Sequence, residues 1–342
     1  MLRSLTIKNF RGFRELTIEP LARVNLIAGK NNVGKTGVLE ALYLLFSNSG
    51  QFFHFPSAFR SNQEKVSGTP DEQERKDNFA SFWRWLPNKS DEVGQIQITA
   101  KEQQDDSNPI VPSFELHLDE KSTKEPTYNL TFHYRRNGSE FVSRAAAGPF
   151  LQGKMPGLLP VKICSTRHTQ PTEDAELFNS LVLKKKKKIL IELLKTVEPR
   201  LEDMQYLKVG SEPLVYADVG LKELIPLTQL GQGVIRLFRF FSEMLVEEAR
   251  IILIDEIENG IHHSALADVW TGIAEIAEKE DLQIFATTHS WESIEAAHSV
   301  FQSREHYNFA LHRLQMVKGE VQVVTHDQRM IEVAEKTDLE IR

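Results

Sequence analysis

The chain has 342 residues, of which 41% are hydrophobic and 26% are charged, as in a globular protein with a sizeable core. Its formal net charge of −7 provides no strong positive field for nucleic acid, so such contact requires a local patch or a partner. The single cysteine, Cys164, excludes an internal disulfide, and no apolar run approaches the roughly 20 residues of a membrane span. We therefore expect a cytoplasmic protein without a membrane segment.

The first structural signal is a glycine-rich loop between a strand and a helix. Residues 2–28 alternate between apolar and polar side chains, which predicts short strands, and a helix-like run ends near Phe46. Between them, residues 29–36 fit the phosphate-loop pattern GxxxxGK[ST] at every fixed position. Strand, loop and helix together direct backbone N–H groups and a helix N-terminus at a phosphate.

This loop predicts binding of a nucleoside triphosphate, which we take to be ATP. Lys35 is expected to reach the β- and γ-phosphates, and the Thr36 hydroxyl is expected to bind Mg²⁺. The nucleotide-binding residues predicted in the loop are Gly29, Asn31, Asn32, Val33, Gly34, Lys35 and Thr36.

Residues 50–150 differ in character from the segment before them. Aromatic residues are frequent between positions 52 and 85, and residues 95–100, 114–118 and 128–134 alternate with a period of two. This pattern predicts a β-rich insertion. Aromatic side chains are able to stack on nucleic-acid bases, but the segment has few basic residues to hold a phosphate backbone. We therefore interpret these aromatic residues as core.

The next segment combines a buried strand with helical character. Residues 161–164 are mostly apolar and predict the strand, whereas residues 174–208 carry apolar side chains at helical spacing. Five consecutive lysines, Lys184–Lys188, are predicted to lie within this helix. They could contact nucleic acid or a nucleotide, but a solvated helix end also explains them and is the interpretation we favour.

Gly231 and Gly233 precede an amphipathic run, which predicts a helix opened by glycines. The N-terminus of such a helix is a second ready-made anion site. Because one phosphate loop is enough for a chain to bind ATP, the second site suggests that it caps the nucleotide held by another copy. We therefore expect a homo-oligomer, at least a dimer.

Two acidic residues follow a strongly apolar strand. Residues 251–254 are Ile-Ile-Leu-Ile, and Asp255 and Glu256 come directly after them. This is the carboxyl end of a central strand, where α/β folds bind ligands. Asp255 is expected to hold Mg²⁺, and Glu256 to deprotonate the attacking water as a general base. His289 follows the next predicted strand, 283–288, and is expected to contact the γ-phosphate or the water.

These motifs in this order resemble ABC-type ATPases outside the transporter branch. Residues 9–13, Asn-Phe-Arg-Gly-Phe, are similar to the opening of the RecF and structural-maintenance-of-chromosomes (SMC) group. Residues 254–262 and 287–290 resemble the stand-alone ATPases of the overcoming-lysogenization-defect type. The likeness covers residues 1–48 and 215–300 and hardly touches the rest.

The resemblance implies an α/β fold, an ABC-type P-loop ATPase with a mixed sheet flanked by helices and a β-rich plus helical insertion. It places the two ATPase segments at residues 1–48 and 214–342 and the insertion at residues 49–213. The implied site roles are Walker B aspartate for Asp255, catalytic glutamate for Glu256, switch histidine for His289, dimer contact for Glu258–His262, signature motif for Gly231 and Gly233, and nucleotide contact for Arg11.

The sequence also departs from this group. Gly231 replaces the signature serine, so one hydroxyl contact to the partner's γ-phosphate is missing. Gln152 and Gln170 are both candidates for the Q-loop glutamine, and the sequence does not decide between them. The nuclease domain of the TOPRIM fold that this group carries is not expected here, because only about 50 residues follow His289 and they hold no acidic cluster.

The implied function is a homodimeric ATPase whose ATP state gates a separately encoded effector, such as a nuclease, in bacterial anti-phage defence. One alternative is a RecF-like ATPase of DNA repair or recombination that clamps DNA directly. Another is a nucleotide-gated scaffold with little turnover. The acidic net charge weighs against direct DNA clamping, and Glu256 weighs against a pure scaffold.

Overall fold

The computed structural model describes most of the chain outside residues 47–170 and parts of that segment. The described residues are 1–46, 88, 95–102, 113–119, 127–136, 139–147, 160–164, 171–209, 212–246 and 249–337. The aromatic residues predicted as core between positions 52 and 85, and the two candidate Q-loop glutamines, Gln152 and Gln170, lie outside them.

A six-stranded sheet in the order β15-β14-β3-β13-β12-β8 forms the centre of the molecule. Its strands are β3 (Val24–Ala28), β8 (Val161–Cys164), β12 (Ile251–Ile254), β13 (Gln283–Thr288), β14 (Phe309–Val317) and β15 (Glu320–His326). All neighbours pair in parallel except β14 and β15, so the sheet is mixed, as predicted. The strands β3, β12 and β13 are fully buried, which explains the continuous apolar sequence of β12.

A second sheet covers one side of the molecule in the order β2-β1-β4-β5-β6-β7. Its strands are β1 (Leu2–Phe10), β2 (Phe13–Ile18), β4 (Gln95–Glu102), β5 (Ser113–Asp119), β6 (Thr127–Arg136) and β7 (Ser139–Ala147), all antiparallel. The period-2 strands predicted between residues 95 and 134 are therefore confirmed. Because β4 pairs with β1 and β8 joins the central sheet, the predicted insertion shares both sheets with the ATPase segments.

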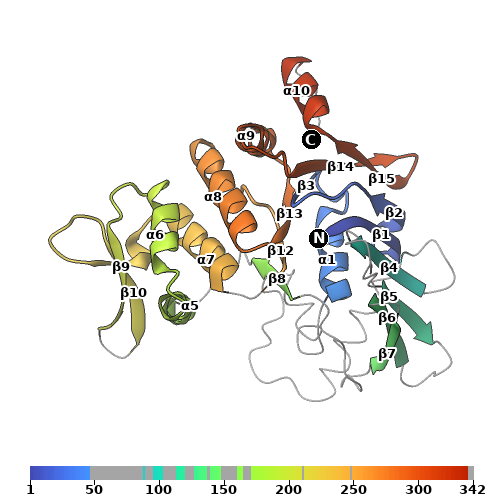
Figure 1. Ribbon diagram of the computed structural model, residues 1–342, viewed down its shortest axis with the longest axis horizontal. Helices are drawn as coiled ribbons and strands as arrows, with labels where there is room; N and C mark the ends of the chain where they lie inside the picture. The colour runs from blue at the N-terminus through green and yellow to red at the C-terminus, as the bar shows by residue number, and fades with distance from the viewer. Residues whose placement is uncertain are drawn as a thin grey trace.

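Helices flank the central sheet on both faces (Figure 1). On one side α1 (Lys35–Phe46) lies between the two sheets, and its apolar residues share a core with Ile27, Leu253 and Phe285. On the other side α7 (Gln232–Val246), α8 (Leu266–Lys279) and α9 (Trp291–Gln302) share a core with Leu26 and Ile254. Alternate residues of each strand thus point into different cores. Buried on both faces, the sheet rigidly fixes the loops at its carboxyl edge.

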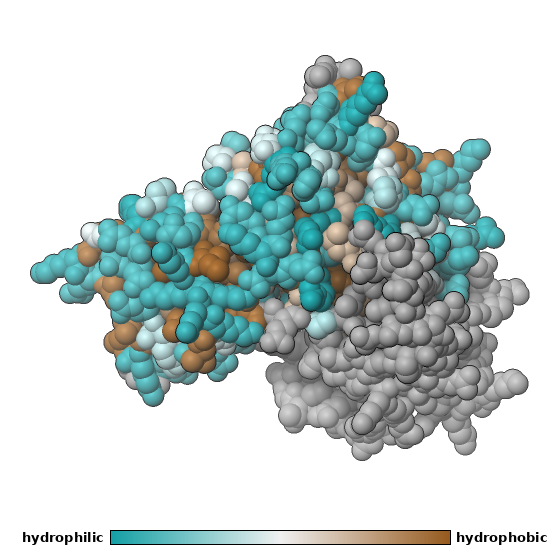
Figure 2. Space-filling view, in the orientation of Figure 1, coloured by the Kyte–Doolittle hydropathy of each residue, from teal (hydrophilic) through white to brown (hydrophobic). Residues whose placement is uncertain are grey.

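A small lobe lies at the far end of the molecule (Figure 1). It combines α5 (Pro171–Leu183) and α6 (Lys187–Lys195) with a three-stranded sheet of β9 (Asp203–Lys208), β10 (Pro213–Asp218) and β11 (Ile225–Pro226). Its helices pack on α7. Figure 2 shows apolar patches over this lobe on an otherwise mostly hydrophilic face. The remaining elements are α10 (Gln328–Thr337) and the short 3₁₀ helices Leu227–Gln229 and His263–Ala265.

The prediction of one helix over residues 174–208 is wrong. The chain forms two helices separated at residues 184–186, and residues 203–208 pair with β10 as a strand. Lys185 takes a left-handed backbone conformation, φ 58°, which ends α5. Pro199 follows α6 and disfavours helical conformation in the residue before it. The lysine run therefore spans a break between helices.

Within the described part of the chain, no helix is both long enough and apolar enough to cross a membrane.

Candidate nucleotide site

The phosphate loop occupies the turn between β3 and α1, and its backbone explains two of its glycines. Gly29 has φ 149°, and a Cβ there would lie 2.7 Å from the Leu314 carbonyl oxygen. Gly34 has φ 109°, and a Cβ there would lie 2.8 Å from the Phe13 ring. Both conformation and space therefore require glycine. The Gly34 carbonyl accepts the Val38 N–H at 3.2 Å, so the helix starts directly from the loop.

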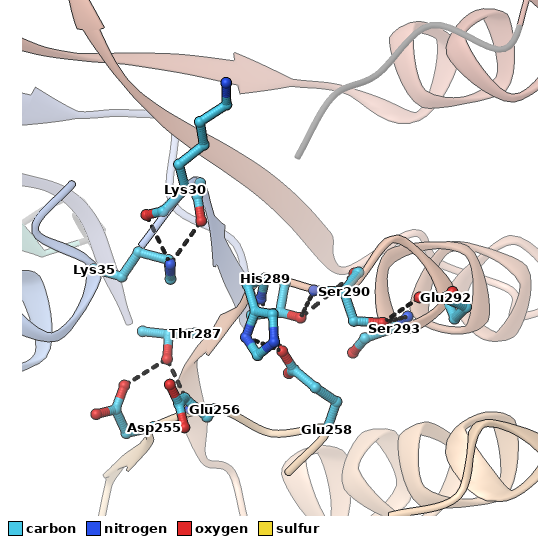
Figure 3. A network of polar contacts seen from close by, with 12 residues as sticks. Lys30, Lys35, Asp255, Glu256, Glu258, Thr287, His289, Ser290, Glu292 and Ser293 are labelled. Carbon is cyan, nitrogen blue, oxygen red and sulfur yellow. Dashed lines mark hydrogen bonds and ion pairs between the residues drawn. The ribbon is translucent and has the colours of Figure 1, made fainter. Parts of the chain in front are cut away.

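Lys35 points back over the loop from the first turn of α1. Its Nζ donates to the carbonyl oxygens of Gly29, at 2.6 Å, and Lys30, at 3.0 Å (Figure 3). Burial lowers the pKa of the Lys35 ammonium, and the nearby carboxylates of Glu258, Asp255 and Glu256 oppose this shift. A cation held by carbonyl dipoles at a glycine loop is suited to exchange these contacts for phosphate oxygens.

Asp255 connects three elements at the carboxyl edge of the central sheet. It follows β12 and accepts hydrogen bonds from the Thr36 hydroxyl, at 3.1 Å to Oδ2, and from the Thr287 hydroxyl, at 2.6 Å to Oδ1. Thr36 belongs to α1, and Thr287 lies in β13, the strand beside β12. The two halves of the predicted site, separated by more than 200 residues in sequence, thus meet directly.

The donor set at this point fits Mg²⁺. A hydroxyl and a carboxylate are hard oxygen ligands, and Mg²⁺ in nucleotide sites takes one or two protein ligands beside phosphate and water oxygens. Among the described residues, no group of three or more histidine, cysteine, aspartate or glutamate side chains could hold a metal by itself. Thr36 and Asp255 therefore suit a metal that arrives with a phosphate ligand.

Glu256 lies just beyond Asp255, on a backbone held from two sides. Its N–H donates to the Thr287 hydroxyl oxygen at 2.8 Å, and its carbonyl oxygen accepts from Arg236 Nη2 of α7 at 2.8 Å. The residue has φ 49°, a left-handed conformation that is uncommon outside glycine. The Glu256 side chain is exposed at the strand edge, where a water molecule can reach it.

His289 follows β13 and is bound to Glu258, which follows β12. Glu258 Oε1 accepts the His289 backbone N–H at 2.8 Å and lies 2.9 Å from the ring nitrogen Nδ1 (Figure 3). The Glu258 side chain is 10% exposed and the imidazole is 50% exposed. The histidine thus projects from a buried anchor at the same sheet edge as Asp255 and Glu256.

Gly231 and Gly233 lie at the start of α7, as predicted. The Gly231 carbonyl accepts the N–H groups of Val234 and Ile235, and a Cβ on Gly231 would contact nothing within 4 Å. A Cβ on Gly233 would lie 3.4 Å from the Gly260 carbonyl oxygen. The helix start therefore lies against the turn after Glu256, whereas the space beside Gly231 is open among the described residues.

Arg11 lies beside α1, where it pairs with Glu40. Its guanidinium forms two hydrogen bonds to the Glu40 carboxylate, at 2.8 and 3.0 Å, and lies 6.0 Å from the centre of the Phe10 ring. Glu40 is a buried residue of α1. The two hydrogen bonds use Nε and Nη2, and a guanidinium has five N–H donors, so Arg11 can keep this ion pair and still donate to a further acceptor.

The fold brings together Lys35, Thr36, Asp255, Glu256 and His289. Gly233 lies at the turn after Glu256, whereas Arg11 pairs with Glu40 of α1. Sequence reasoning missed Thr287, Arg236 and the pairing of Glu258 with His289. For Thr287 a signal existed, because β12 and β13 were both predicted and the parallel register of Ile254 with Ala286 places Thr287 beside Asp255. For Arg236, no pattern in the sequence indicated that α7 meets the turn after β12.

Two family models match the chain. The one described as "AAA ATPase domain" matches residues 1–147, and the one described as "AAA domain, putative AbiEii toxin, Type IV TA system" matches residues 165–295. Neither alone spans half of the chain, and together they include both halves of the site.

Two proteins of known description are similar in sequence to this chain. An "ATP/GTP phosphatase" of Helicobacter pylori is 24% identical over 89% of this chain and 90% of its own length. The DNA replication and repair protein RecF of Clostridioides difficile is 39% identical over 64 residues, which are 19% of this chain and 15% of that protein.

Two solved SMC head structures have the same fold. The head bound to the C-winged helix domain of ScpA has a TM-score of 0.57 at 14% identity, covering 98% of this chain and 99% of that one. The head domain from Thermotoga maritima has a TM-score of 0.51 at 16% identity, covering 95% of this chain and 99% of that one.

Proposed function

We propose that this chain, an ABC-type ATPase of the RecF and SMC kind, hydrolyses ATP between two copies of itself and uses the ATP-bound state to gate a separately encoded effector. The observation that best supports the ATPase function is the contact between the phosphate loop and the adjacent acidic residues Asp255 and Glu256. Thr36 of the loop donates to Asp255, and Glu256 comes next in the chain at the same sheet edge.

Each site residue has a distinct task in this proposal. Lys35 would leave the Gly29 and Lys30 carbonyls for the β- and γ-phosphates, and Thr36 and Asp255 would hold Mg²⁺. When bound, Mg²⁺ would supply positive charge that neutralises the phosphates. Glu256 accepts the proton of the attacking water, while Thr287 and Arg236 fix the Glu256 backbone. His289 contacts the γ-phosphate or the water from the neighbouring strand end.

The second copy completes the site in this proposal. Within one chain the open face of Gly231 is at the start of α7, and the partner's γ-phosphate is the anion it would meet. The gated effector, a nuclease in anti-phage defence, follows from the likeness of residues 254–262 and 287–290 to stand-alone defence ATPases. The match to a toxin–antitoxin family model also supports a role in defence.

The test of the ATPase function separates binding from chemistry. Lys35→Ala should abolish ATP binding, because the triphosphate loses its buried cation. Glu256→Gln should keep ATP affinity and slow turnover by ~10²-fold or more, the usual scale for a general base. Nucleotide affinity and steady-state turnover are measured for both variants and the wild type. Wild-type turnover in Glu256→Gln would show that another group activates the water.

Direct clamping of DNA is the second candidate, and the matches to RecF favour it. Two measurements on Glu256→Gln, which should accumulate the ATP-bound state, distinguish a DNA clamp from an effector gate: DNA binding and the activity of the neighbouring nuclease. A DNA clamp should bind duplex DNA only with ATP, and the affinity should fall steeply with salt. An effector gate should leave DNA unbound, and it should change the nuclease activity of the neighbouring gene product in an ATP-dependent way that Lys35→Ala abolishes.

A further inference from the structure

We propose that Glu258 is a positioning residue that holds His289 in one orientation and one tautomer. The inference rests on the proposed function, because it assigns a task to a residue of the same ATPase site. In the sequence, Glu258 belongs only to a loop expected to contact the partner.

The geometry of this contact is specific. One carboxylate oxygen, Glu258 Oε1, meets both the backbone N–H of His289, at 2.8 Å, and its ring Nδ1, at 2.9 Å. Two contacts to one oxygen restrain both the backbone position of the residue and the rotation of its ring. Glu258 follows β12 and His289 follows β13, so the contact connects the loops at the ends of two neighbouring strands.

The contact also determines which ring nitrogen carries a proton. An ionised carboxylate accepts hydrogen bonds and donates none, so Nδ1 must be the protonated nitrogen that faces it. The neutral imidazole then keeps its lone pair on Nε2. Nε2 is therefore the nitrogen left to meet the attacking water or the γ-phosphate. Without Glu258, nothing described at Nδ1 would select this tautomer.

Two cations, Lys35 and Arg236, lie in the field of the Glu258 carboxylate, but within the described part of the chain its side chain hydrogen-bonds only to His289. Glu258 Oε2 is buried and accepts no hydrogen bond from a described residue. Burial lowers the pKa of Lys35 and of Arg236, and the Glu258 carboxylate is the strongest of the charges opposing both shifts. A buried carboxylate with one oxygen unsatisfied is costly. His289 is the residue to which its satisfied oxygen is committed.

The kinetic test compares Glu258→Ala with Glu258→Gln. The amide oxygen of glutamine can accept the same two hydrogen bonds, whereas alanine accepts none. Glu258→Ala should lower kcat by about 10- to 100-fold, by analogy with the loss on removing the outer partner of a metal-bound histidine. KM for ATP should change by less than about threefold, and Glu258→Gln should restore kcat to within about threefold of wild type. Glu295→Ala removes an exposed carboxylate of α9 and should leave both constants unchanged.

A double-mutant cycle tests whether Glu258 acts through His289. In a His289→Ala background, Glu258→Ala should cause no further loss of kcat, because the residue it positions is gone. If the two losses multiply, Glu258 acts independently and the proposal is wrong. It is equally wrong if Glu258→Gln is as impaired as Glu258→Ala, or if Glu258→Ala turns over normally.

A spectroscopic readout does not depend on activity. The ¹⁵N spectrum of the imidazole in the nucleotide-free full chain should show a protonated Nδ1 for His289, identified among the 11 histidines by its loss in His289→Ala. Glu258→Ala should lose this preference and Glu258→Gln should keep it. A neutral His289 protonated on Nε2 in the wild type overturns the inference, even if Glu258→Ala does not fold. Absence of ATP hydrolysis in the wild type would refute the proposed function. The spectrum would still decide whether Glu258 selects the tautomer of His289.

Discussion

His312 is a fully buried histidine of the central sheet. Its Nδ1 lies 3.0 Å from the Thr325 hydroxyl, and its Nε2 lies 3.3 Å from the Asn25 side-chain oxygen. Burial, together with the neighbouring His326, lowers the pKa of His312 to about 3. The folded protein therefore keeps this ring neutral at pH values where the unfolded chain protonates it.

This shift predicts loss of stability at acidic pH. Between pH 6.5 and about 3 the unfolded state binds the proton that the folded state refuses, so the free energy of unfolding falls as the pH is lowered and is unaffected above pH 6.5. At pH 5 the contribution is about 2 kcal/mol, from 1.36 kcal/mol per pH unit. In His312→Gln the drop in unfolding free energy between pH 7 and pH 5 should be smaller by this amount.

The control for this prediction is His306→Gln, which removes an exposed histidine and should retain the wild-type pH dependence. Denaturant unfolding at pH 7 and pH 5 provides the comparison. Equal drops in His312→Gln and in the wild type would mean that the buried ring gains its proton without unfolding.

The site residues that could be predicted from sequence are those in a fixed local pattern. Lys35 and Thr36 follow from loop spacing, and Asp255 and Glu256 from an apolar strand that ends in acids. The contacts of Glu258 and Arg236 could not be predicted, because they join side chains of different elements whose orientation depends on packing. Thr287 is intermediate, since strand register alone places it beside Asp255.

At the scale of elements, a local hydrogen-bonding motif causes the break between α5 and α6, and no glycine marks it in the sequence. The Lys186 N–H donates to the Leu181 carbonyl and the Lys185 N–H to the Val182 carbonyl, the pair of bonds that ends a helix in a Schellman motif. The left-handed position of this motif is usually glycine, and here it is Lys185. Helical periodicity without a glycine therefore predicted one continuous helix, and the chain forms two.

Two lysines of the run 184–188 form hydrogen bonds to the C-terminal end of α7. Lys184 Nζ donates to the Val246 carbonyl, and Lys186 Nζ donates to the Leu245 carbonyl at 3.0 Å, both in the last turn of α7. Lys186 also pairs with Glu280 at 2.7 Å. Cations at a helix C-terminus satisfy its last carbonyl groups and complement the helix dipole. Part of the run thus stabilises the contact between the small lobe and α7.

We predict that Lys184→Gln with Lys186→Gln lowers the free energy of unfolding by about 1 kcal/mol, the combined scale of a C-terminal cation and a surface ion pair. The matched control is Lys185→Gln with Lys188→Gln, which removes the same charge from side chains with no hydrogen bond or ion pair among the described residues, and it should not destabilise. Denaturant unfolding measures both. If the lysine run binds nucleic acid, both double variants should instead bind nucleic acid more weakly and with a flatter salt dependence than the wild type.

At the scale of the whole molecule, the two sheets and the helix layers place the site at one edge. The parallel strands β12 and β13, which precede the proposed catalytic residues Glu256 and His289, end there, and α1 starts there. The mixed sheet and its flanking helices were implied by the resemblance to ABC-type ATPases, whereas local signals alone predicted single strands such as β12 and β13. The pairing of β4 with β1 was not predictable, since the two strands are about 90 residues apart in sequence and their antiparallel register is a tertiary choice.

This arrangement predicts a site shared between two copies. In the proposed dimer, the Gly231 face of one copy meets the phosphate loop of the other across a two-fold axis, and a Cβ on Gly231 meets nothing within 4 Å in its own chain. Gly231→Asp places a carboxylate where the partner's γ-phosphate should dock, and like charges at 4 Å repel by about 1 kcal/mol in water and more in a dry interface. The variant should bind ATP through Lys35 and fail to hydrolyse it. Gly231→Asn has the same shape without the charge and should retain more activity.

Mixing the inactive variants tests the shared site directly. A dimer of Gly231→Asp with Lys35→Ala holds one intact composite site, formed by Lys35 of one chain and Gly231 of the other. Partial recovery of ATPase activity on mixing is the expected result. Gly231 rather than Gly233 is the position of choice, because a Cβ there meets nothing within 4 Å and the fold is left undisturbed. If subunits exchange and activity stays absent, either the site lies within one chain or both sites must fire together. Titrating each variant into wild type separates these outcomes, because only obligatory joint firing makes activity fall more steeply than simple dilution.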